Sequence, residues 1–448
     1  MTDATLARWR ADAVLIFRAA VTAADPTRLV LEHLARDGSE VLVKGADGMT
    51  RRWRSPTLVV GAGKAAARMA AGCERVLGAE NLRGEVVVAD GCALDLQTIT
   101  VTEAGHPLPD GRGAAAARRL IDLVKAPQAD AILGLFSGGA SSLLVCPRPP
   151  ISLDDKVRTT RLLLDCGADI NELNTVRKHL SLVKGGGLLR HAAAPVTTLI
   201  ISDVVGDDPG TIASGPTSPD PTRFADAWAV LQRYHLTRRV PRTVARLLRD
   251  GVGGRLPETV KPDSPEAARC CNLVIGSNRT ALHGAADMAR EMGCRVHIET
   301  DPLVGDTADT ARHFAARIRT LAGEHRARKP LCILAGGETT VRVHGRGRGG
   351  RNMEFALALA DVIAGTQLAV LSAGTDGVDG PTTAAGAFVD GTTRERAAQR
   401  RLNPALALAD NDSHTFFAQL GDLFECGPTG TNVMDIKIAL APAFSGSV

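Results

Sequence analysis

Residues 331–381 read LCILAGGETTVRVHGRGRGGRNMEFALALADVIAGTQLAVLSAGTDGVDGP, and this stretch decides the predicted fold class. Its first apolar run predicts a short strand at 331–334 that breaks at Gly336-Gly337-Glu338, before a second strand at 339–343. A helix-like run at 352–364 and another apolar strand at 368–373 follow, each flanked by glycine-rich loops. Strands that alternate with helices in this way predict an α/β fold.

The two loops of this stretch carry opposite charges. The loop at 345–351 holds four glycines and three arginines, so its backbone can approach a ligand and its side chains can bind phosphate or carboxylate. The second loop holds Asp376 and Asp379, which are hard oxygen ligands of the kind that Mg²⁺ prefers. Arginine together with Mg²⁺ indicates phosphoryl transfer. The alternative is that the glycines only make turns and the charges are solvated.

Composition places the chain among globular proteins of more than one domain. Its 448 residues allow two or three domains, and a net charge of +4 gives no reason to expect nucleic acid or a membrane as a partner. The nine cysteines are scattered without a CxxC motif, which favours reduced thiols over disulfides or a zinc site. Without a signal peptide or a long apolar run, we expect a soluble, cytoplasmic protein.

The N-terminal half repeats a strand–loop–helix pattern. Such βαβ units predict a mostly parallel sheet, whose ligands gather at the carboxyl ends of the strands. Three of these ends carry loops rich in Gly, Ser or Asp. The expected strands are residues 57–60, 85–89, 132–136 and 196–201, and helical spacing appears at 112–125 and 155–166.

Lys64 follows the first of these strands, in the first turn of a helix. The surrounding Gly61-Ala62-Gly63-Lys64-Ala65 matches neither a phosphate-binding Walker loop nor a dinucleotide fingerprint, which requires glycine where Ala66 stands. Lysine is disfavoured at a helix N-terminus, so Lys64 is either solvated or held there to meet an anion.

A second basic segment lies at residues 174–187. Arg177, Ser181 and Lys184 fall near one face of a predicted helix, which forms either a binding site or a solvated basic surface. His106 is expected to be a turn residue rather than a catalyst.

The glycine-, proline- and charge-rich residues 251–264 provide the best domain boundary. We therefore predict an N-terminal Rossmann-like α/β domain at 1–250, a linker at 251–264 and a C-terminal α/β domain at 265–448.

Several stretches together resemble one family, the glycerate 2-kinases of the MOFRL type, which are often described as hydroxypyruvate reductases. The resemblance implies that the two domains place the active site in the cleft between them. It also implies the reaction of D-glycerate with ATP to give 2-phosphoglycerate and ADP, with Mg²⁺ or a similar divalent metal. The stretches that carry it are 102–107, 137–139, 174–178, 202–207, 336–340, 349–352, 375–380 and 427–432.

The resemblance also assigns roles to residues of this chain. Lys64 and Arg351 would face the γ-phosphate or the glycerate carboxylate, and Asp203 or Asp207 would accept the hydroxyl proton or hold metal. Asp376 and Asp379 would serve the metal or the substrate hydroxyls. Met353, Gly187 and Met434 depart from the family's pattern. The expected substrate- or nucleotide-binding residues are Ser137, Gly138, Gly139, Ser141, Arg177, Lys184, Glu338, Asn352 and Asn432.

The competing prediction is an NAD(P)H-dependent hydroxypyruvate reductase, which would need a nicotinamide site. The nearest dinucleotide-like motif fails at Ala66. In either case the expected partners are small molecules, a hydroxy acid and a nucleotide, and the sequence leaves a homodimer open.

Overall fold

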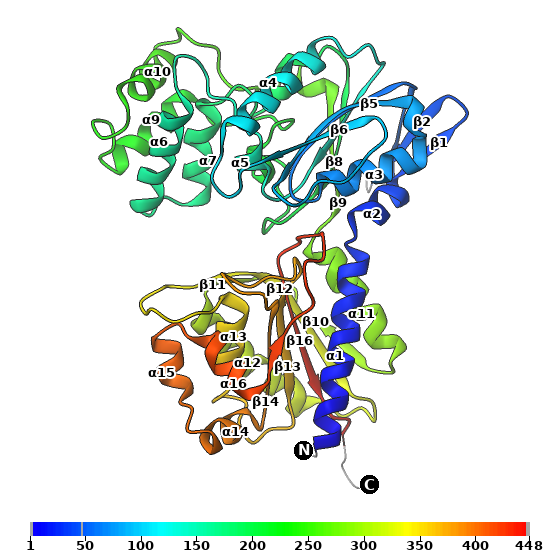
Figure 1. Ribbon diagram of the computed structural model, residues 1–448, viewed down its shortest axis with the longest axis vertical. Coiled ribbons are helices and arrows are strands. Elements are labelled where there is room, and N and C mark those ends of the chain that lie inside the picture. The colour runs from blue at the N-terminus through cyan, green and yellow to red at the C-terminus, as the bar shows by residue number, and fades with distance from the viewer. Residues whose placement is uncertain (1–2, 46–47, 445–448) are drawn as a thin grey trace. The chain divides into compact units, whose positions relative to one another are not determined.

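The computed structural model describes residues 3–45 and 48–444 of the chain (Figure 1). The chain divides into two compact units at two points, between Asp25 and Pro26 and between Ile275 and Gly276. We call the first unit, from Pro26 to Ile275, the parallel-sheet unit, and we call the rest the mixed-sheet unit. Each unit combines helices with a β-sheet, which confirms the predicted α/β class.

A six-stranded sheet of order β6-β5-β4-β7-β8-β9 forms the centre of the parallel-sheet unit. The pairings from β6 through β8 are all parallel. β4, β7 and β8 are buried along their whole lengths, as expected for a parallel sheet covered on both faces. The strands are β4 (Thr57–Ala62), β5 (Leu82–Ala89), β6 (Ile99–Ala104), β7 (Ile132–Phe136), β8 (Val196–Ile201) and β9 (Cys270–Gly276).

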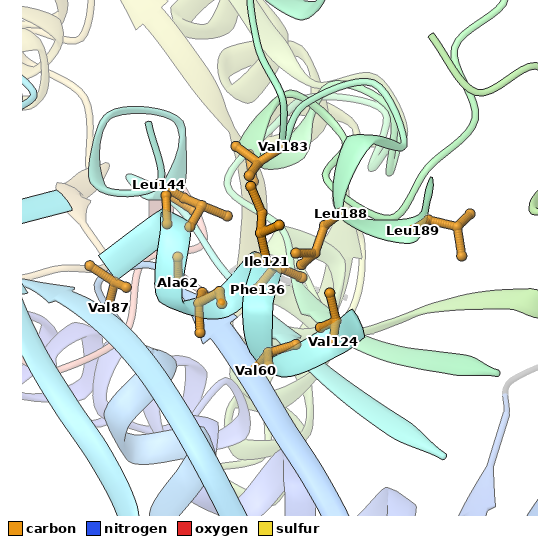
Figure 2. Close-up of a cluster of buried hydrophobic side chains, with 14 of the residues drawn as sticks. Val60, Ala62, Val87, Ile121, Val124, Phe136, Leu144, Val183, Leu188 and Leu189 are labelled. Atoms are coloured by element: carbon orange, nitrogen blue, oxygen red, sulfur yellow. The ribbon is translucent and has the colours of Figure 1, made fainter. Parts of the chain in front are cut away.

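Helices pack on this sheet and bury its apolar residues. Figure 2 shows Val60 and Phe136 of the sheet beside Ile121 and Val124 of α4, all of them buried. Asp110 begins α4 by accepting a hydrogen bond from the Gly113 amide, which satisfies one of the free N–H groups of the first turn. The helices are α3 (Ala66–Leu77), α4 (Gly111–Lys125), α5 (Ala140–Leu143) and α8 (Gly187–His191), and α2 (Pro26–His33) packs on α3.

Four further helices of this unit form a bundle with its own apolar core. Capping boxes begin two of them: Ser152 with Asp155 begins α6, and Asp169 with Glu172 begins α7. The bundle consists of α6 (Leu153–Asp165), α7 (Ile170–His179), α9 (Phe224–Arg233) and α10 (Arg242–Val252). A small antiparallel sheet, which the sequence reading missed, comprises β1 (Leu34–Asp37), β2 (Glu40–Lys44) and β3 (Thr50–Arg54).

The mixed-sheet unit contains a seven-stranded sheet of order β10-β12-β16-β13-β14-β15, with β11 also paired to β12. Its longest strand, β12, continues through Gly336 and Gly337, so the predicted break there is wrong. The reason is pairing on both sides: β16 pairs as far as Gly337, and β11 pairs from Gly337 to Thr340. The strands are β10 (Arg295–Ile298), β11 (Leu303–Asp306), β12 (Leu331–Thr340), β13 (Ala369–Gly374), β14 (Gly386–Asp390), β15 (Leu423–Phe424) and β16 (Asp435–Ala441).

The N-terminal helix α1 (Asp3–Ala23) belongs to the mixed-sheet unit. It packs on α11, where a side chain at Gly284 would lie 2.4 Å from the Ala23 Cβ, and its Arg10 pairs with Asp390 and Asp422. The structural division therefore differs from the predicted domains in the placement of this helix. The other helices are α11 (Asn278–Glu291), α12 (Thr307–Glu324), α13 (Arg351–Leu359), α14 (Thr393–Gln399), α15 (Pro404–Ala409) and α16 (Ser413–Leu420).

Residues 251–264, the predicted linker, lie within the parallel-sheet unit, where the Val260 amide donates to the Gly185 carbonyl. Among the helices of the described ranges, none has the length and apolarity that crossing a membrane requires.

Candidate functional site

The loops after β4 and β7 interlock at one edge of the parallel sheet. The Lys64 amide donates to the Gly138 carbonyl over 2.9 Å, and the Ala65 amide donates to Ser137 Oγ over 3.0 Å. Gly63 lies directly on Ser137 with a φ of +135°, where a Cβ would come within 2.2 Å of the hydroxyl. These contacts fix Lys64 beside the loop that follows β7, because β4 and β7 are adjacent parallel strands.

Two glycines of that loop make room for three polar side chains. A Cβ on Gly138 would lie 1.9 Å from Asp203 Oδ2, and one on Gly139 would lie 3.1 Å from the His106 ring and 3.3 Å from Lys64 Cγ. Lys64, His106 and Asp203 therefore surround a backbone turn that only glycine can form without displacing them. His106 lies in a bend, as expected, but its ring also belongs to this cluster.

The environment shifts the titration of two of these groups. Burial raises the pKa of Asp203, although the positive charge of Lys64 opposes the shift. Burial and then Lys64 lower the pKa of His106, so its imidazole is neutral near pH 7. A carboxyl with a raised pKa is suited to accept a proton in a reaction at neutral pH. Asp207 lies four residues after Asp203, in the loop that follows β8. Its own backbone is left-handed, with a φ of 53°.

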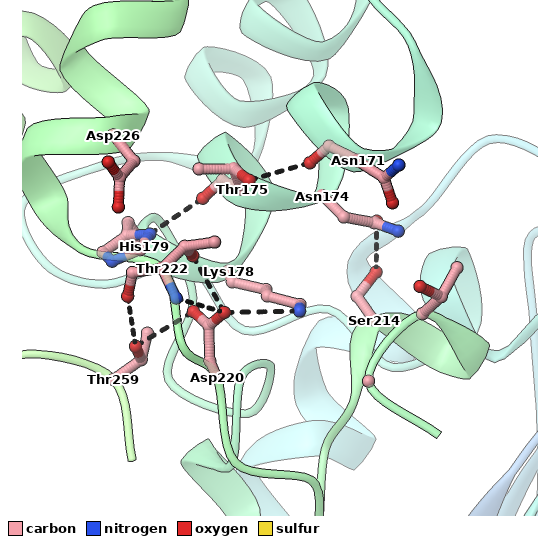
Figure 3. A network of polar contacts seen from close by, with 12 residues as sticks. Asn171, Asn174, Thr175, Lys178, His179, Ser214, Asp220, Thr222, Asp226 and Thr259 are labelled. Atoms are coloured by element: carbon pink, nitrogen blue, oxygen red, sulfur yellow. Dashed lines mark hydrogen bonds and ion pairs between the residues drawn. The ribbon is translucent and has the colours of Figure 1, made fainter. Parts of the chain in front are cut away.

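Arg177 and Lys184 meet at Ser141, at the far end of the segment Ser137–Ser142 that follows β7. Arg177 Nη2 and Lys184 Nζ donate to the Ser141 carbonyl over 3.0 and 2.8 Å. The Ser141 hydroxyl contacts Ser214, which donates to Asn174 Oδ1 (Figure 3). Lys184 is 1% exposed, so the alternative of a solvated basic surface is wrong for it.

The predicted single helical face for these residues is also wrong. α7 ends at His179, and the Ser181 hydroxyl instead accepts hydrogen bonds from the amides of Val183 and Lys184 in the following turn.

Arg351 is the centre of a second cluster, in the mixed-sheet unit. It is the first residue of α13, and its Nε and Nη2 donate to the two oxygens of Asp435 over 2.8 and 3.0 Å. Its Nη1 donates to Glu338 Oε1 over 2.6 Å. Burial opposes the charge of Arg351, but Asp435 outweighs burial and raises the pKa of the guanidinium. Arg351 is therefore held as a charged, oriented fork.

Buried polar residues contact the Asp435 carboxylate that holds this arginine. Lys437 Nζ donates to Asn352 Oδ1 over 2.5 Å and lies 3.7 Å from Asp435 Oδ2 and 4.8 Å from the centre of the Phe355 ring. Burial would raise the pKa of Asp435, but Lys437 and Arg351 hold it below its usual range.

Asp379 has a structural place beside Arg351. Its carboxylate accepts hydrogen bonds from the amides of Asn352 and Met353 and so caps the N-terminus of α13. The carboxyl is 2% exposed, and burial raises its pKa to about 6 despite these bonds.

Asp376 and Asn432 lie in the loops that flank these residues. Asp376 is partly exposed, and its Oδ1 accepts from the Val378 amide, whereas Asn432 Oδ1 accepts from the Met434 amide.

The glycine- and arginine-rich loop at 345–350 packs on protein. Side chains at Gly345 and Gly347 would collide with Asp410 at 2.2 and 2.6 Å, and the amides of Arg346 and Arg348 donate to Asp410 and Asp412. These contacts favour the alternative reading of its glycines, as turn and packing residues.

A metal site can be tested against these donors. Among residues 3–45 and 48–444, no group of three or more His, Cys, Asp or Glu residues is arranged to hold a metal ion. Mg²⁺ bound to a nucleotide needs less, because it keeps several waters and takes only one or two carboxylates besides the phosphates. Partly buried carboxylates such as Asp203 and Asp376 fit that requirement.

The sequence reading missed Asp435 and Lys437 as part of the Arg351 cluster. A signal was present, because the two are the polar residues of an otherwise apolar strand, and a spacing of two places them on one face of it.

Two protein families match the chain. The domain of unknown function DUF4147 matches residues 12–249, and the MOFRL family matches residues 331–435.

Several described proteins resemble it over most of its length. It is 38% identical to the glycerate 2-kinase of Pyrococcus horikoshii over 95% of this chain and 96% of that one. It is 39% identical to the D-glycerate 2-kinase of Thermotoga maritima over 86% and 90% of the two chains. It is also 40% identical to a putative hydroxypyruvate reductase of Agrobacterium vitis over 95% and 93%. The crystal structure of the glycerate kinase of T. maritima superimposes with a TM-score of 0.84, at 35% identity, over 97% of this chain and 99% of that one.

Proposed function

The chain belongs to the glycerate 2-kinases of the MOFRL type, and we propose that it transfers the γ-phosphate of ATP to the C2 hydroxyl of D-glycerate. The products would be 2-phosphoglycerate and ADP. The observation that carries the proposal is the placement of Lys64 and Asp203 on either side of the Gly138-Gly139 turn. A cation and a carboxylate at a glycine turn supply the charge and the proton acceptor that phosphoryl transfer to a hydroxyl requires.

Asp203 is the general base in this proposal. Its raised pKa suits it to accept the C2 hydroxyl proton as the hydroxyl oxygen attacks phosphorus. Lys64 lies on the other side of the turn, where its charge would stabilise the transferring phosphoryl group. Asp207 is the second candidate for the base.

Arg351 contributes a fixed cation. Because Asp435 and Glu338 already hold its guanidinium, it would meet a phosphate or carboxylate without first losing side-chain freedom. Asn432 would contact the substrate or nucleotide.

A divalent metal would enter with the nucleotide, and when bound it would offset the negative charge of the phosphates. Asp376 is the preferred ligand. We assign Asp379 to capping α13 rather than to the metal, because its oxygens accept the amides of Asn352 and Met353. The other expected partners of the protein are small molecules. A cytoplasmic location of the protein stays a prediction.

A reductase is the second candidate, because the A. vitis relative carries that description as putative. It would require a nicotinamide site, and Ala66 occupies the position that a dinucleotide fingerprint reserves for glycine. One experiment separates the two candidates: the purified protein is incubated with D-glycerate and Mg-ATP, and separately with hydroxypyruvate and NADH. ADP formation in the first mixture supports the kinase. NADH oxidation in the second, without ADP formation in the first, overturns it.

A further inference from the structure

A group of three cationic side chains lies behind the Ser137–Ser142 loop. Lys184 and Lys156 are 1% and 4% exposed, and Arg177 is partly exposed. Arg177 lies in α7, Lys184 lies in the turn before α8, and Lys156 lies in α6. Arg177 and Lys184 share the Ser141 carbonyl as acceptor. We call these three residues the buried cationic cluster.

The buried cationic cluster has no anionic partner among the described residues. Within residues 3–45 and 48–444, the buried Nζ of Lys156 has no hydrogen-bond partner, and its charged neighbour is Arg177. Lys184 donates only to the neutral carbonyls of Ser141 and Ala213. The contrast with the neighbouring Lys178 is direct, because Lys178 lies 3.4 Å from the Asp220 carboxylate (Figure 3).

Such an arrangement costs stability. Burial of an unpaired charge in a protein is unfavourable, and apolar residues of similar size are normally more stable there. Burial and the neighbouring Arg177 lower the pKa of Lys156 to about 7, and burial together with Arg177 and Lys156 lowers the pKa of Lys184. The other titratable group that faces Lys156 is the thiol of Cys146, whose pKa burial raises. A destabilising group of this kind is expected where a ligand supplies the missing charge.

The members of the cluster differ in their exposure to solvent. Arg177 is partly exposed, as are Gly139, Ser141 and Ser142 of the loop, whereas the two lysines lie behind them. An anion that reaches Arg177 would therefore contact the loop and the guanidinium group directly. The two lysines would attract it electrostatically through a medium of low dielectric constant.

We propose that the Ser137–Ser142 loop and Arg177 bind a phosphoryl group, and that Lys184 and Lys156 supply its counter-charge from behind. A phosphoryl group is chosen over a carboxylate because it can carry two negative charges against up to three positive ones. Lys156 is thus a positioning residue that the sequence reading did not include. The assignment deepens the proposed function and rests on it only for the source of the phosphoryl group, either the nucleotide or the phosphorylated hydroxy acid.

The test uses Lys156→Met, which removes the charge and keeps the length of the side chain. Affinities for inorganic pyrophosphate, ADP, 2-phosphoglycerate and D-glycerate are measured by calorimetry at pH 7 and constant ionic strength, together with the melting temperature of the free protein. We expect the variant to melt at a higher temperature, yet to bind pyrophosphate about tenfold more weakly. A purely structural lysine would not give this combination. Lys156→Gln serves as a second variant if Lys156→Met does not fold.

Lys125→Met is the matched control, because Lys125 is exposed on α4 and pairs with Asp122 at the surface. It should leave all four affinities unchanged. When pyrophosphate binding is weakened, an added loss for ADP but not for 2-phosphoglycerate identifies the nucleotide as the source, and the reverse identifies the product. A pyrophosphate affinity within twofold of the wild type, or a loss confined to D-glycerate, overturns the proposal. If the wild type lacks kinase activity while Lys156→Met still weakens pyrophosphate binding, the phosphoryl site stands and the proposed reaction fails.

Discussion

Arg351 and Asp435 are joined by two parallel hydrogen bonds, from Nε to Oδ2 at 2.8 Å and from Nη2 to Oδ1 at 3.0 Å. Asp435 is 1% exposed, and Lys437 Nζ lies 3.7 Å from its Oδ2, so this carboxylate interacts with two cations at once. The arginine fork is consequently fixed before any ligand arrives. Two predictions follow from this arrangement.

Arg351→Ala should lower kcat by about 10³, because an arginine that stabilises a phosphoryl-transfer transition state contributes on that order. The circular dichroism spectrum should remain that of the wild type, since the side chain is partly exposed. A fall of less than about tenfold, measured in a steady-state assay with D-glycerate and Mg-ATP, would exclude a transition-state role for Arg351.

Asp435→Asn should destabilise the protein by about 3 kcal/mol, because it leaves the charges of Arg351 and Lys437 without their buried partner. Urea denaturation of the variant measures this difference. Glu338→Gln is the control: Glu338 also pairs with Arg351 but is largely exposed, so its loss should cost less than about 1 kcal/mol. Equal costs for the two variants would contradict the central place given to Asp435.

Gly138→Ala should abolish most activity, because the new Cβ would lie 1.9 Å from Asp203 Oδ2 and would push this carboxylate away from the turn. The expected loss in kcat/KM is at least about 10², the scale of a displaced catalytic group. Gly111→Ala is the matched control, since a Cβ there meets nothing within 4 Å. If Gly138→Ala retains full activity, Asp203 does not act from its observed position.

Asp379 should make stability depend on pH. Its pKa in the folded protein is raised to about 6, above the value of about 3.9 expected in the unfolded chain. The folded state therefore holds the proton more tightly, and the associated stabilisation is complete below pH 4 and is lost as the pH rises through about 6. The difference in unfolding free energy between the wild type and Asp379→Asn should fall by roughly 2 kcal/mol between pH 4 and pH 7. A difference that is constant over this range would show that Asp379 is not perturbed.

The sequence predicts the parts of this protein that depend on local pattern. The buried strands β4, β5, β7 and β8 are found within a few residues of their predicted positions, because continuous apolar runs bounded by glycine and polar loops are strong signals. The sequence also predicts that several loops lie at one edge of a parallel sheet, but it does not predict the pairing of β4 with β7 that brings Lys64 beside Ser137.

What the sequence could not predict depends on contacts between distant segments. The pairing partners of β12 keep Gly336 and Gly337 in a strand, although glycine locally favours a break. In the sequence, Lys156 looks like an ordinary lysine of a helix. Only the packing of α6 in the bundle shows that its side chain is buried. The loop at 345–350 reads as a ligand site, whereas its glycines fit against Asp410.

The most direct test of the proposed reaction compares the wild type with Asp203→Asn in a mixture of D-glycerate and Mg-ATP, followed by ³¹P NMR. We expect the wild type to form ADP and 2-phosphoglycerate, and Asp203→Asn to do so at a rate lower by about 10²–10⁴, the contribution of a general base. A phosphate on C3 rather than C2 would contradict the account, as would an Asp203→Asn variant that keeps the wild-type rate.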